Sequence, residues 1–126
     1  MASRLLLDTH VALWWFSANP QLGANSLEEI AHSECWLSAA SVWEVAIKYK
    51  LGKLPITPLA FIEAANVGGL RLLTITPNHT AETVNLPVLH SDPFDRLLLA
   101  QAKLEKLTLL TADSTLAAYG HYVRSV

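Results

Sequence analysis

The stretch RLLLDTHVALWWF, residues 4–16, decides how this chain folds. Its leucines at 5–7 form an apolar run without alternating polar residues, which is typical of a short strand covered on both faces of a parallel sheet. A helix is expected to follow directly, from about Thr9 to Phe16. Asp8 lies between the two segments, and a buried carboxylate there is costly unless it is hydrogen bonded, paired or bound to a metal.

Short apolar runs and helical segments alternate along the rest of the chain. We expect further strands at residues 35–39, 70–76, 107–113 and 121–126, and helices at residues 25–33, 41–52, 58–69, 77–87 and 91–107. Strands that alternate with helices predict right-handed crossovers and an α/β fold, a parallel sheet with helices on both faces. Ligands of such sheets bind at the carboxyl ends of the strands, where Asp8 and Asp113 are expected.

Local signals indicate where two of these helices begin. Asn25 or Ser26 is expected to cap the second helix, because both side chains are good hydrogen-bond acceptors for free backbone N–H groups. Ser41 followed by Glu44 three residues later matches a capping box at the start of the third helix.

The composition predicts one domain over residues 1–126. The chain is 52% hydrophobic and 16% charged, with a mean hydropathy of +0.30, which is apolar for a domain of this size. Either a dense core or a surface covered by a partner accounts for this excess and for the four tryptophans. The tryptophans are Trp14, Trp15, Trp36 and Trp43.

Sequence features also bear on location and charge. No apolar run approaches the ~18–20 residues that cross a bilayer, and an acid follows the N-terminus too early for a secretory signal. The single cysteine, Cys35, predicts no internal disulfide and a cytoplasmic setting.

The net charge is −2. Without the four acids considered next, 11 − 4 = 7 acids face 9 basic residues, or +2, which leaves nucleic-acid binding open.

Four acids are candidates for a shared site, although three of them also have structural explanations. Asp8 and Asp113 each follow an expected strand, where an N-cap is worth about 1 kcal/mol. Glu44 completes the expected capping box and also lies four residues before Lys48. At about 100° per residue these two side chains share one helix face, where an ion pair is worth ~0.2–0.5 kcal/mol.

The segment SDPFDR, residues 91–96, contains two acids that differ in helical phase. Asp92 precedes a proline and is the expected N-cap. Asp95 lies inside the helix, in phase with Leu98 and Leu99 on its apolar face, where a carboxylate has no cheap structural explanation. Asp95 is therefore the functional candidate of the pair, and Asp92 an accessory one.

Parallel topology can bring Asp8, Glu44, Asp95 and Asp113 to one end of the sheet. Clustered carboxylates repel one another unless a cation lies among them. Oxygen ligands without a Cys/His set favour Mg²⁺ or Mn²⁺ over zinc. A carboxylate-held Mg²⁺ that keeps several waters is typical of sites that act on phosphates.

Four motifs in this order, LLLDTHVALWW, SAASVWEVAIKYKLGKL, HSDPFDRLLLAQA and LTLLTAD, resemble those of the PIN-domain ribonucleases. The resemblance is strongest to VapC-type toxins of bacterial toxin–antitoxin pairs and spans nearly the whole chain. It implies a three-layer α/β/α fold with a central parallel sheet of four to five strands. It also places the family's acids at the four candidates, with Thr9 as the usual hydroxyl neighbour. Leu116 departs from the pattern, because many members have an aromatic residue there.

The resemblance further implies Mg²⁺-dependent hydrolysis of single-stranded or loop RNA, with Mn²⁺ as a substitute, that leaves a 5′-phosphate and a 3′-hydroxyl. Asp8, Asp95 and Asp113 would bind the metal directly or through water, and Glu44 would hold or help deprotonate a metal water. A homodimer, a cognate VapB-type antitoxin and no membrane contact are implied as well. The helices after Asp8 and after Ser41 are candidate surfaces for these contacts.

Two other functions stay open. One is a catalytically silent PIN-like binding module that acts through its partner. The other is a phosphatase with Asp8 as nucleophile, although such enzymes usually have a second aspartate two residues on, where this chain has His10.

Other polar residues carry weaker signals. The spacing of the histidines does not suggest the pair that a metal-independent ribonuclease needs. They are His10, His32, His79, His90 and His121. Three lysines, at 48, 50 and 53, either steer the RNA backbone or belong to a solvated helix end. For Arg96, an ion pair with a carboxylate, RNA binding and contact with the antitoxin all stay open.

Overall fold

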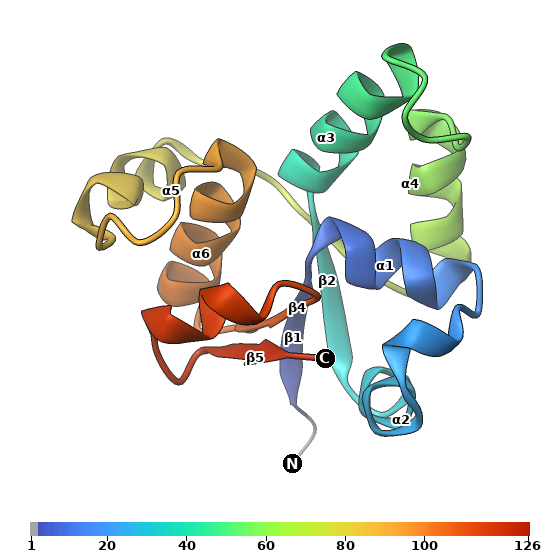
Figure 1. Ribbon diagram of the computed structural model, residues 1–126, viewed down its shortest axis with the longest axis horizontal. Helices are drawn as coiled ribbons and strands as arrows, with labels where there is room; N and C mark the ends of the chain where they lie inside the picture. Colours follow the sequence, from blue (N-terminus) through green and yellow to red (C-terminus); the bar gives the residue numbers. More distant parts are fainter. Residues whose placement is uncertain (1–2) are drawn as a thin grey trace.

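Five parallel strands form one central sheet in the computed structural model, which describes residues 3–126 (Figure 1). The strand order is β3-β2-β1-β4-β5. The strands are β1 Arg4–Leu7, β2 Glu34–Ser38, β3 Arg71–Leu73, β4 Thr108–Thr111 and β5 Val123–Ser125. Each neighbouring pair is parallel. The predicted α/β fold with a parallel sheet of four to five strands is therefore confirmed.

Helices cover both faces of this sheet and complete the three-layer arrangement. They are α1 Thr9–Phe16, α2 Ala24–Ala31, α3 Ala39–Lys50, α4 Pro58–Val67, α5 Pro77–Glu82 and α6 Pro93–Glu105, with short 3-10 helices at Pro20–Leu22, Thr83–Asn85 and Ser114–Tyr119. Figure 1 shows α1, α2 and α4 on one side of the sheet and α5 and α6 on the other. Within residues 3–126, no helix has the length and apolarity needed to span a bilayer.

The leucines of β1 connect the two halves of the core. Leu5 and Leu7 are fully buried in the cluster that contains Phe61 of α4. Leu6 faces the opposite way and is buried in the cluster that contains Leu98 and Leu99 of α6. Side chains alternate between the faces of a strand, so an apolar run without polar residues is what a strand covered on both faces requires.

The order of the strands creates a crevice beside β1. From β1 the chain proceeds to β2 and β3 on one side of the sheet, and then returns to β4 and β5 on the other. Parallel α/β sheets bind ligands at such a switch point, outside the carboxyl ends of the strands. Asp8 follows β1 there, and Asp113 follows β4.

Two predicted helix caps are wrong. Helix α2 begins at Ala24, one residue before Asn25, and its N-cap position is Gly23 with φ 82°, so neither Asn25 nor Ser26 caps it. The helix after β2 begins at Ala39, because the strand runs directly into it, and Ser38 caps it by accepting a hydrogen bond from the N–H of Ala40.

The Ser41–Glu44 capping box is consequently absent. Ser41 lies inside α3, and its buried hydroxyl has no hydrogen-bond partner among the described residues. The helix predicted at 77–87 is also shorter than expected, since α5 ends at Glu82 and a 3-10 turn follows it.

Candidate functional site

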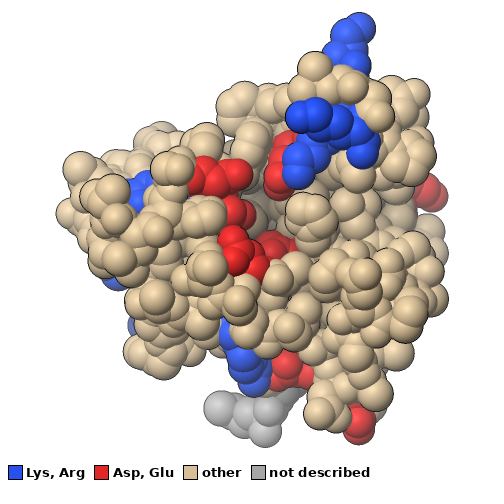
Figure 2. All heavy atoms as spheres, viewed as in Figure 1, with Lys and Arg blue, Asp and Glu red and all other residues tan. Residues whose placement is uncertain are grey.

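Five carboxylates line one open cleft of about 490 Å³ at the carboxyl ends of β1 and β4. They are Asp8, Glu44, Asp92, Asp95 and Asp113. In Figure 2 the acidic side chains gather in a central hollow of the molecule. The four acids selected from the sequence and the accessory Asp92 therefore lie around a shared space, although they come from separate parts of the chain.

Asp8 is buried, at 6% exposed, and both of its oxygens are hydrogen bonded. Oδ1 accepts from the N–H of Val11 at 2.8 Å, which caps α1. Oδ2 accepts from the hydroxyl of Thr111 at 2.6 Å and from the N–H of Ala112 at 2.9 Å. Burial raises the pKa of Asp8, and these hydrogen bonds oppose that effect. Capping and a place in the cleft are thus compatible roles for this residue.

Glu44 is held by a residue on each side. The hydroxyl of Thr9 donates to Oε1 at 2.6 Å, and Lys48 Nζ lies 3.0 Å from Oε2. The helix ion pair expected from the spacing of Glu44 and Lys48 is confirmed. Thr9, expected only as a neighbour of Asp8, orients Glu44 across the gap between α1 and α3.

Asp92 and Asp95 occupy the first turn of α6 in different roles. Asp92 Oδ1 caps the helix by accepting from the N–H groups of Phe94 and Asp95, as predicted. The carboxylate of Asp95 faces the cleft and lies 2.8 Å from His90 Nε2. Burial raises the pKa of Asp95 to about 6; the His90 hydrogen bond opposes this, and the charges of Asp92 and Asp8 reinforce it.

Asp113 lies in the turn after β4 and starts the 3-10 helix that follows. Its Oδ1 accepts from the N–H of Thr115 at 2.9 Å and from the Thr115 hydroxyl at 2.7 Å. These hydrogen bonds lower the pKa of Asp113 below its ordinary value. The expected N-cap is therefore present, and the side chain still reaches the cleft.

The chemistry of this donor set fits a hard divalent cation. Carboxylate oxygens are the ligands that Mg²⁺ and Mn²⁺ favour. Asp8 Oδ1 accepts only one hydrogen bond and keeps a lone pair for a ligand. Burial raises the pKa of Asp8 and of Asp95, so the ionised form of each carboxylate is disfavoured in the protein alone. A cation bound between them would stabilise the ionised forms.

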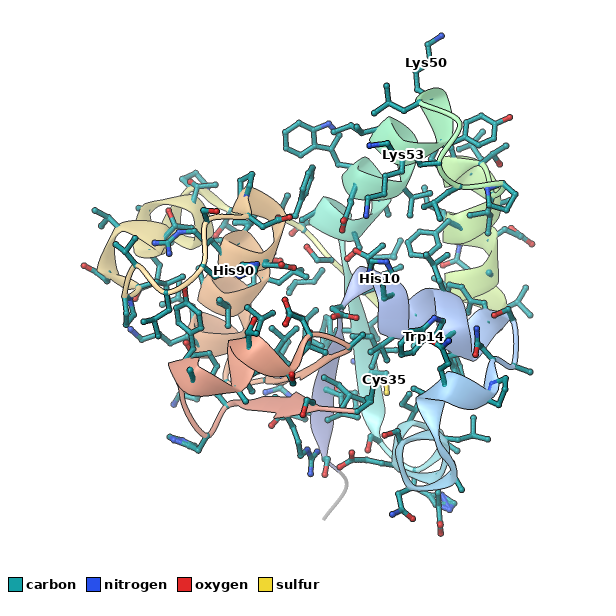
Figure 3. The ribbon with its side chains drawn as sticks, in the orientation of Figure 1. His10, Trp14, Cys35, Lys50, Lys53 and His90 are labelled. Carbon is teal, nitrogen blue, oxygen red and sulfur yellow. The ribbon has the colours of Figure 1, made fainter. Side chains whose placement is uncertain are left out.

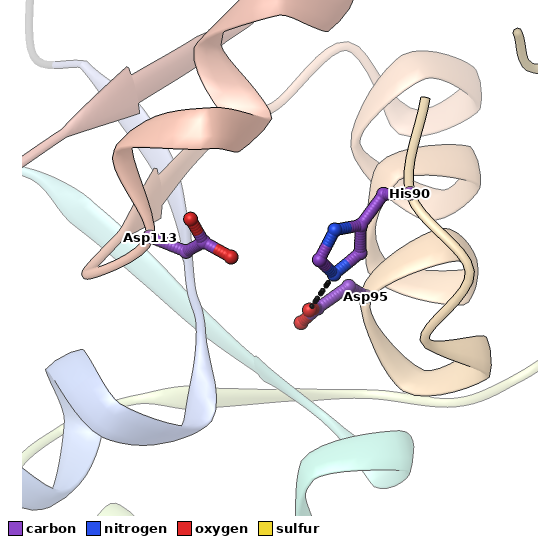
Figure 4. Close-up of side chains that lie close together, drawn as sticks. All are labelled: His90, Asp95 and Asp113. Atoms are coloured by element: carbon purple, nitrogen blue, oxygen red, sulfur yellow. Dashed lines mark hydrogen bonds and ion pairs between the residues drawn. The ribbon is translucent and has the colours of Figure 1, made fainter. Parts of the chain in front are cut away.

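Two residues of the site have no clear signal in the sequence. His90 lies within reach of Asp95 and Asp113, so that one ligand atom from each falls within 4.8 Å of the others (Figure 4). Thr111 is fully buried, and its hydroxyl, which donates to Asp8, also accepts from the N–H of Asp113 at 3.0 Å. β4 consists of two leucines between Thr108 and Thr111, and nothing in this pattern predicts that Thr111 rather than Thr108 contacts Asp8.

Arg96 makes a set of hydrogen bonds that the sequence did not suggest. Its guanidinium donates to the carbonyl oxygens of four residues in the preceding segment. They are Thr83 at 2.8 Å, Leu86 at 3.4 Å, Pro87 at 3.0 Å and His90 at 3.2 Å. Arg96 thus holds the loop that presents His90 against the first turn of α6.

Other side chains border the cleft from α1 and α3. His10 and Trp14 line it from α1 (Figure 3). Lys48 lines it from α3. Lys50 and Lys53, at the C-terminal end of α3 and in the turn after it, are exposed and lie outside the lining of the cleft (Figure 3).

Comparisons with known proteins agree with this geometry. The chain is 35% identical over 122 residues to Ribonuclease VapC22 of Mycobacterium tuberculosis, an alignment that covers 93% of this chain and 92% of that protein. Two solved structures share the fold. A toxin-antitoxin complex from Klebsiella pneumoniae matches with a TM-score of 0.68 and 20% identity over 95% of both chains. VapBC2 from Rickettsia felis, bound to a DNA fragment from its promoter, matches with a TM-score of 0.66 and 17% identity over 96% of this chain and 97% of that one.

The sequence pattern of the PIN domain matches residues 5–122, which extends from β1 into the turn before β5. This range contains every acid of the cleft. Together with the 35% identity over most of the chain, it shows that this protein belongs to the PIN domain family, in its VapC branch.

Proposed function

We propose that this protein is a metal-dependent endoribonuclease, the toxin of a toxin–antitoxin pair, with Mg²⁺ as its ion and Mn²⁺ as a substitute. One observation carries the proposal: Asp8, Glu44, Asp95 and Asp113 line a single open cleft. The similarity to a relative named as a ribonuclease supports the choice of RNA as substrate.

Each acid has a role suited to its surroundings. Asp8, Asp95 and Asp113 would hold the ion, directly or through water. Bound Mg²⁺ supplies charge neutralisation at the phosphodiester and a more acidic water. Glu44, oriented by Thr9, accepts the proton of the attacking water as general base.

Lysine side chains complete this arrangement. Lys48 Nζ lies 3.0 Å from Glu44 Oε2 and, together with Thr9, holds that carboxylate at the edge of the cleft. Lys50 and Lys53, which are exposed at the end of α3, contact the RNA backbone outside the acidic hollow.

A VapB-type antitoxin and a second copy of the chain are the proposed partners. The similar structure from Klebsiella pneumoniae is a toxin–antitoxin complex, and the one from Rickettsia felis is VapBC2, which supports the antitoxin. Co-expression with the product of a neighbouring reading frame tests it. Co-purification of the two chains and inhibition of RNA cleavage are expected, and free, uninhibited toxin would contradict the pairing. Light scattering of the purified protein measures whether it is a dimer.

The decisive experiment measures cleavage of RNA by protein freed of any partner. Cleavage is expected with Mg²⁺ or Mn²⁺ and not with a chelator, and the products should carry a 5′-phosphate. Asp95→Asn and Asp113→Asn should lower the rate about a hundredfold or more, because each removes a charge that holds the ion. Glu63→Gln is the matched control, since Glu63 is an exposed acid of α4 outside the cleft.

The same experiment distinguishes the two alternatives. A silent binding module would cleave no RNA and would bind Mn²⁺ too weakly to measure. An Asp8-nucleophile phosphatase would release phosphate from monoesters and form a phosphoryl-aspartate. Asp8 is poorly suited to that reaction, because it is buried and Oδ2 already accepts two hydrogen bonds.

A further inference from the structure

His90 comes from the loop before α6 and faces two of the cleft carboxylates. Its Nε2 lies 2.8 Å from Asp95 Oδ2. Figure 4 shows the imidazole ring beside the carboxylate of Asp95 on α6, with Asp113 of the turn after β4 opposite both of them. The three residues therefore reach one point from three separate segments, with one ligand atom of each within 4.8 Å of the others.

The spacing of two of these atoms, one from His90 and one from Asp95, matches that of neighbouring ligands around a single ion. Metal–ligand bonds of ~2.1 Å in an octahedron place adjacent ligand atoms about 3 Å apart. The nitrogen of His90 and the oxygen of Asp95, 2.8 Å apart, already have this separation. An ion can thus replace the hydrogen bond between His90 and Asp95, and the Asp113 carboxylate, whose ligand atom lies within 4.8 Å of both, needs only a small movement to join them.

The backbone that carries His90 is also fixed. Arg96 donates to the His90 carbonyl oxygen at 3.2 Å and to the Pro87 carbonyl oxygen at 3.0 Å. The imidazole is half-buried, with its side chain 25% exposed, close to the 24% of Asp95. A ring held at its backbone and partly shielded loses little freedom when it binds an ion.

We propose that Nε2 of His90 is a direct ligand of the divalent ion that Asp95 and Asp113 hold, so that the site is a mixed nitrogen–oxygen site. This inference rests on the proposed function, because it assumes an ion among these carboxylates. An imidazole ligand favours a transition ion over Mg²⁺, so the site selects Mn²⁺ more strongly than carboxylates alone would.

The test uses Mn²⁺ as the probe, added to the metal-free protein without RNA. Electron spin-echo modulation detects a nitrogen bound to Mn²⁺. The wild-type protein should show ¹⁴N modulation, and labelling its histidines with ¹⁵N should change the pattern accordingly. His90→Asn should remove the signal. His10→Asn is the matched control, because His10 lines the same cleft from α1 and should leave the signal intact.

Calorimetry supplies a second measurement on the same proteins. The ratio of Mn²⁺ to Mg²⁺ affinity should fall about tenfold in His90→Asn and stay unchanged in His10→Asn. Bound Mn²⁺ without nitrogen modulation in the wild-type protein would overturn the inference and leave the proposed function standing. Absence of any Mn²⁺ binding would overturn both.

Discussion

The hydroxyl of Thr111 donates a 2.6 Å hydrogen bond to Asp8 Oδ2, although 103 positions separate the two residues. The same hydroxyl accepts from the N–H of Asp113 at 3.0 Å. Thr111 is fully buried at the end of β4. One side chain therefore fixes the positions of two acids of the cleft relative to each other.

Replacing Thr111 by Val tests this relationship, because valine keeps the shape and removes the hydroxyl. The Asp113 N–H then loses its partner and Asp8 keeps fewer donors, which should cost about 1–3 kcal/mol of unfolding free energy. Urea denaturation measures this loss, and RNA cleavage should fall with it. Thr111→Ser keeps the hydroxyl and should retain most of the stability. If Thr111→Val and Thr111→Ser lost the same unfolding free energy, the effect would come from packing and not from the hydroxyl.

Arg96→Lys tests how the loop that carries His90 is held. A lysine ammonium cannot reproduce the planar fork that donates to several carbonyl oxygens at once. The variant should lose about 1–3 kcal/mol of stability, and amide hydrogen exchange in residues 83–92 should be faster.

The control for this prediction is Arg71→Lys. Arg71 is exposed, its Nη2 lies 3.8 Å from Glu34, and its guanidinium lies 5.6 Å from the centre of the Trp36 ring, so the change should cost less than about 1 kcal/mol and leave residues 83–92 unaffected. Unchanged exchange in residues 83–92 of Arg96→Lys would show that other contacts hold the loop.

Much of the fold could be predicted from local sequence, for a physical reason. The apolar run at 5–7 is explained by burial on both faces of the sheet. Asp8 and Asp113 could be brought together from the sequence because parallel strands end at a common edge. The helical phase of Asp95 was sufficient to distinguish it from the capping Asp92.

The rest depends on contacts that are distant in sequence. Ser38 and Ser41 both match a helix cap, and pairing of Ser38 with Leu73 in the sheet decides where the strand ends. The position of His90 beside Asp95 depends on the loop before α6, whose carbonyl oxygens Arg96 holds against that helix. No spacing rule within the sequence encodes either result.

The Cys35 thiol should react slowly in the folded protein. It is 6% exposed, and burial, with the nearby charges of Glu29 and Glu34, raises its pKa to about 11. Because the thiolate is the reactive form, alkylation by iodoacetamide near pH 8 should be at least about a hundredfold slower in the native than in the urea-unfolded protein. Cys35 is the only cysteine, so mass spectrometry measures this rate directly. Similar rates in both states would contradict its burial.

Asp95 should lower the stability of the metal-free protein above acidic pH. Its folded pKa is raised from 3.8 to about 6, so the folded state binds the proton more tightly than the unfolded state. The stability that the protonated group contributes is complete below pH 3.8 and is lost as the pH rises through 6. In chelator at neutral pH, Asp95→Asn should therefore be more stable than the wild type by roughly 1–2 kcal/mol, after allowance for solvent screening.

Asp113→Asn should change the stability of the metal-free protein in the opposite direction to Asp95→Asn. The pKa of Asp113 is lowered by its hydrogen bonds from Thr115, so its contribution is present above the unfolded pKa and is lost as the pH falls. This variant should be slightly less stable than the wild type at neutral pH, and the difference should vanish in acid. Urea titrations between about pH 3 and 8 measure both variants.

Added Mn²⁺ should make the wild type more stable than Asp95→Asn, because the ion stabilises only the folded protein that can hold it. An Asp95→Asn variant that is less stable than the wild type in chelator would show that the carboxylate is compensated without an ion.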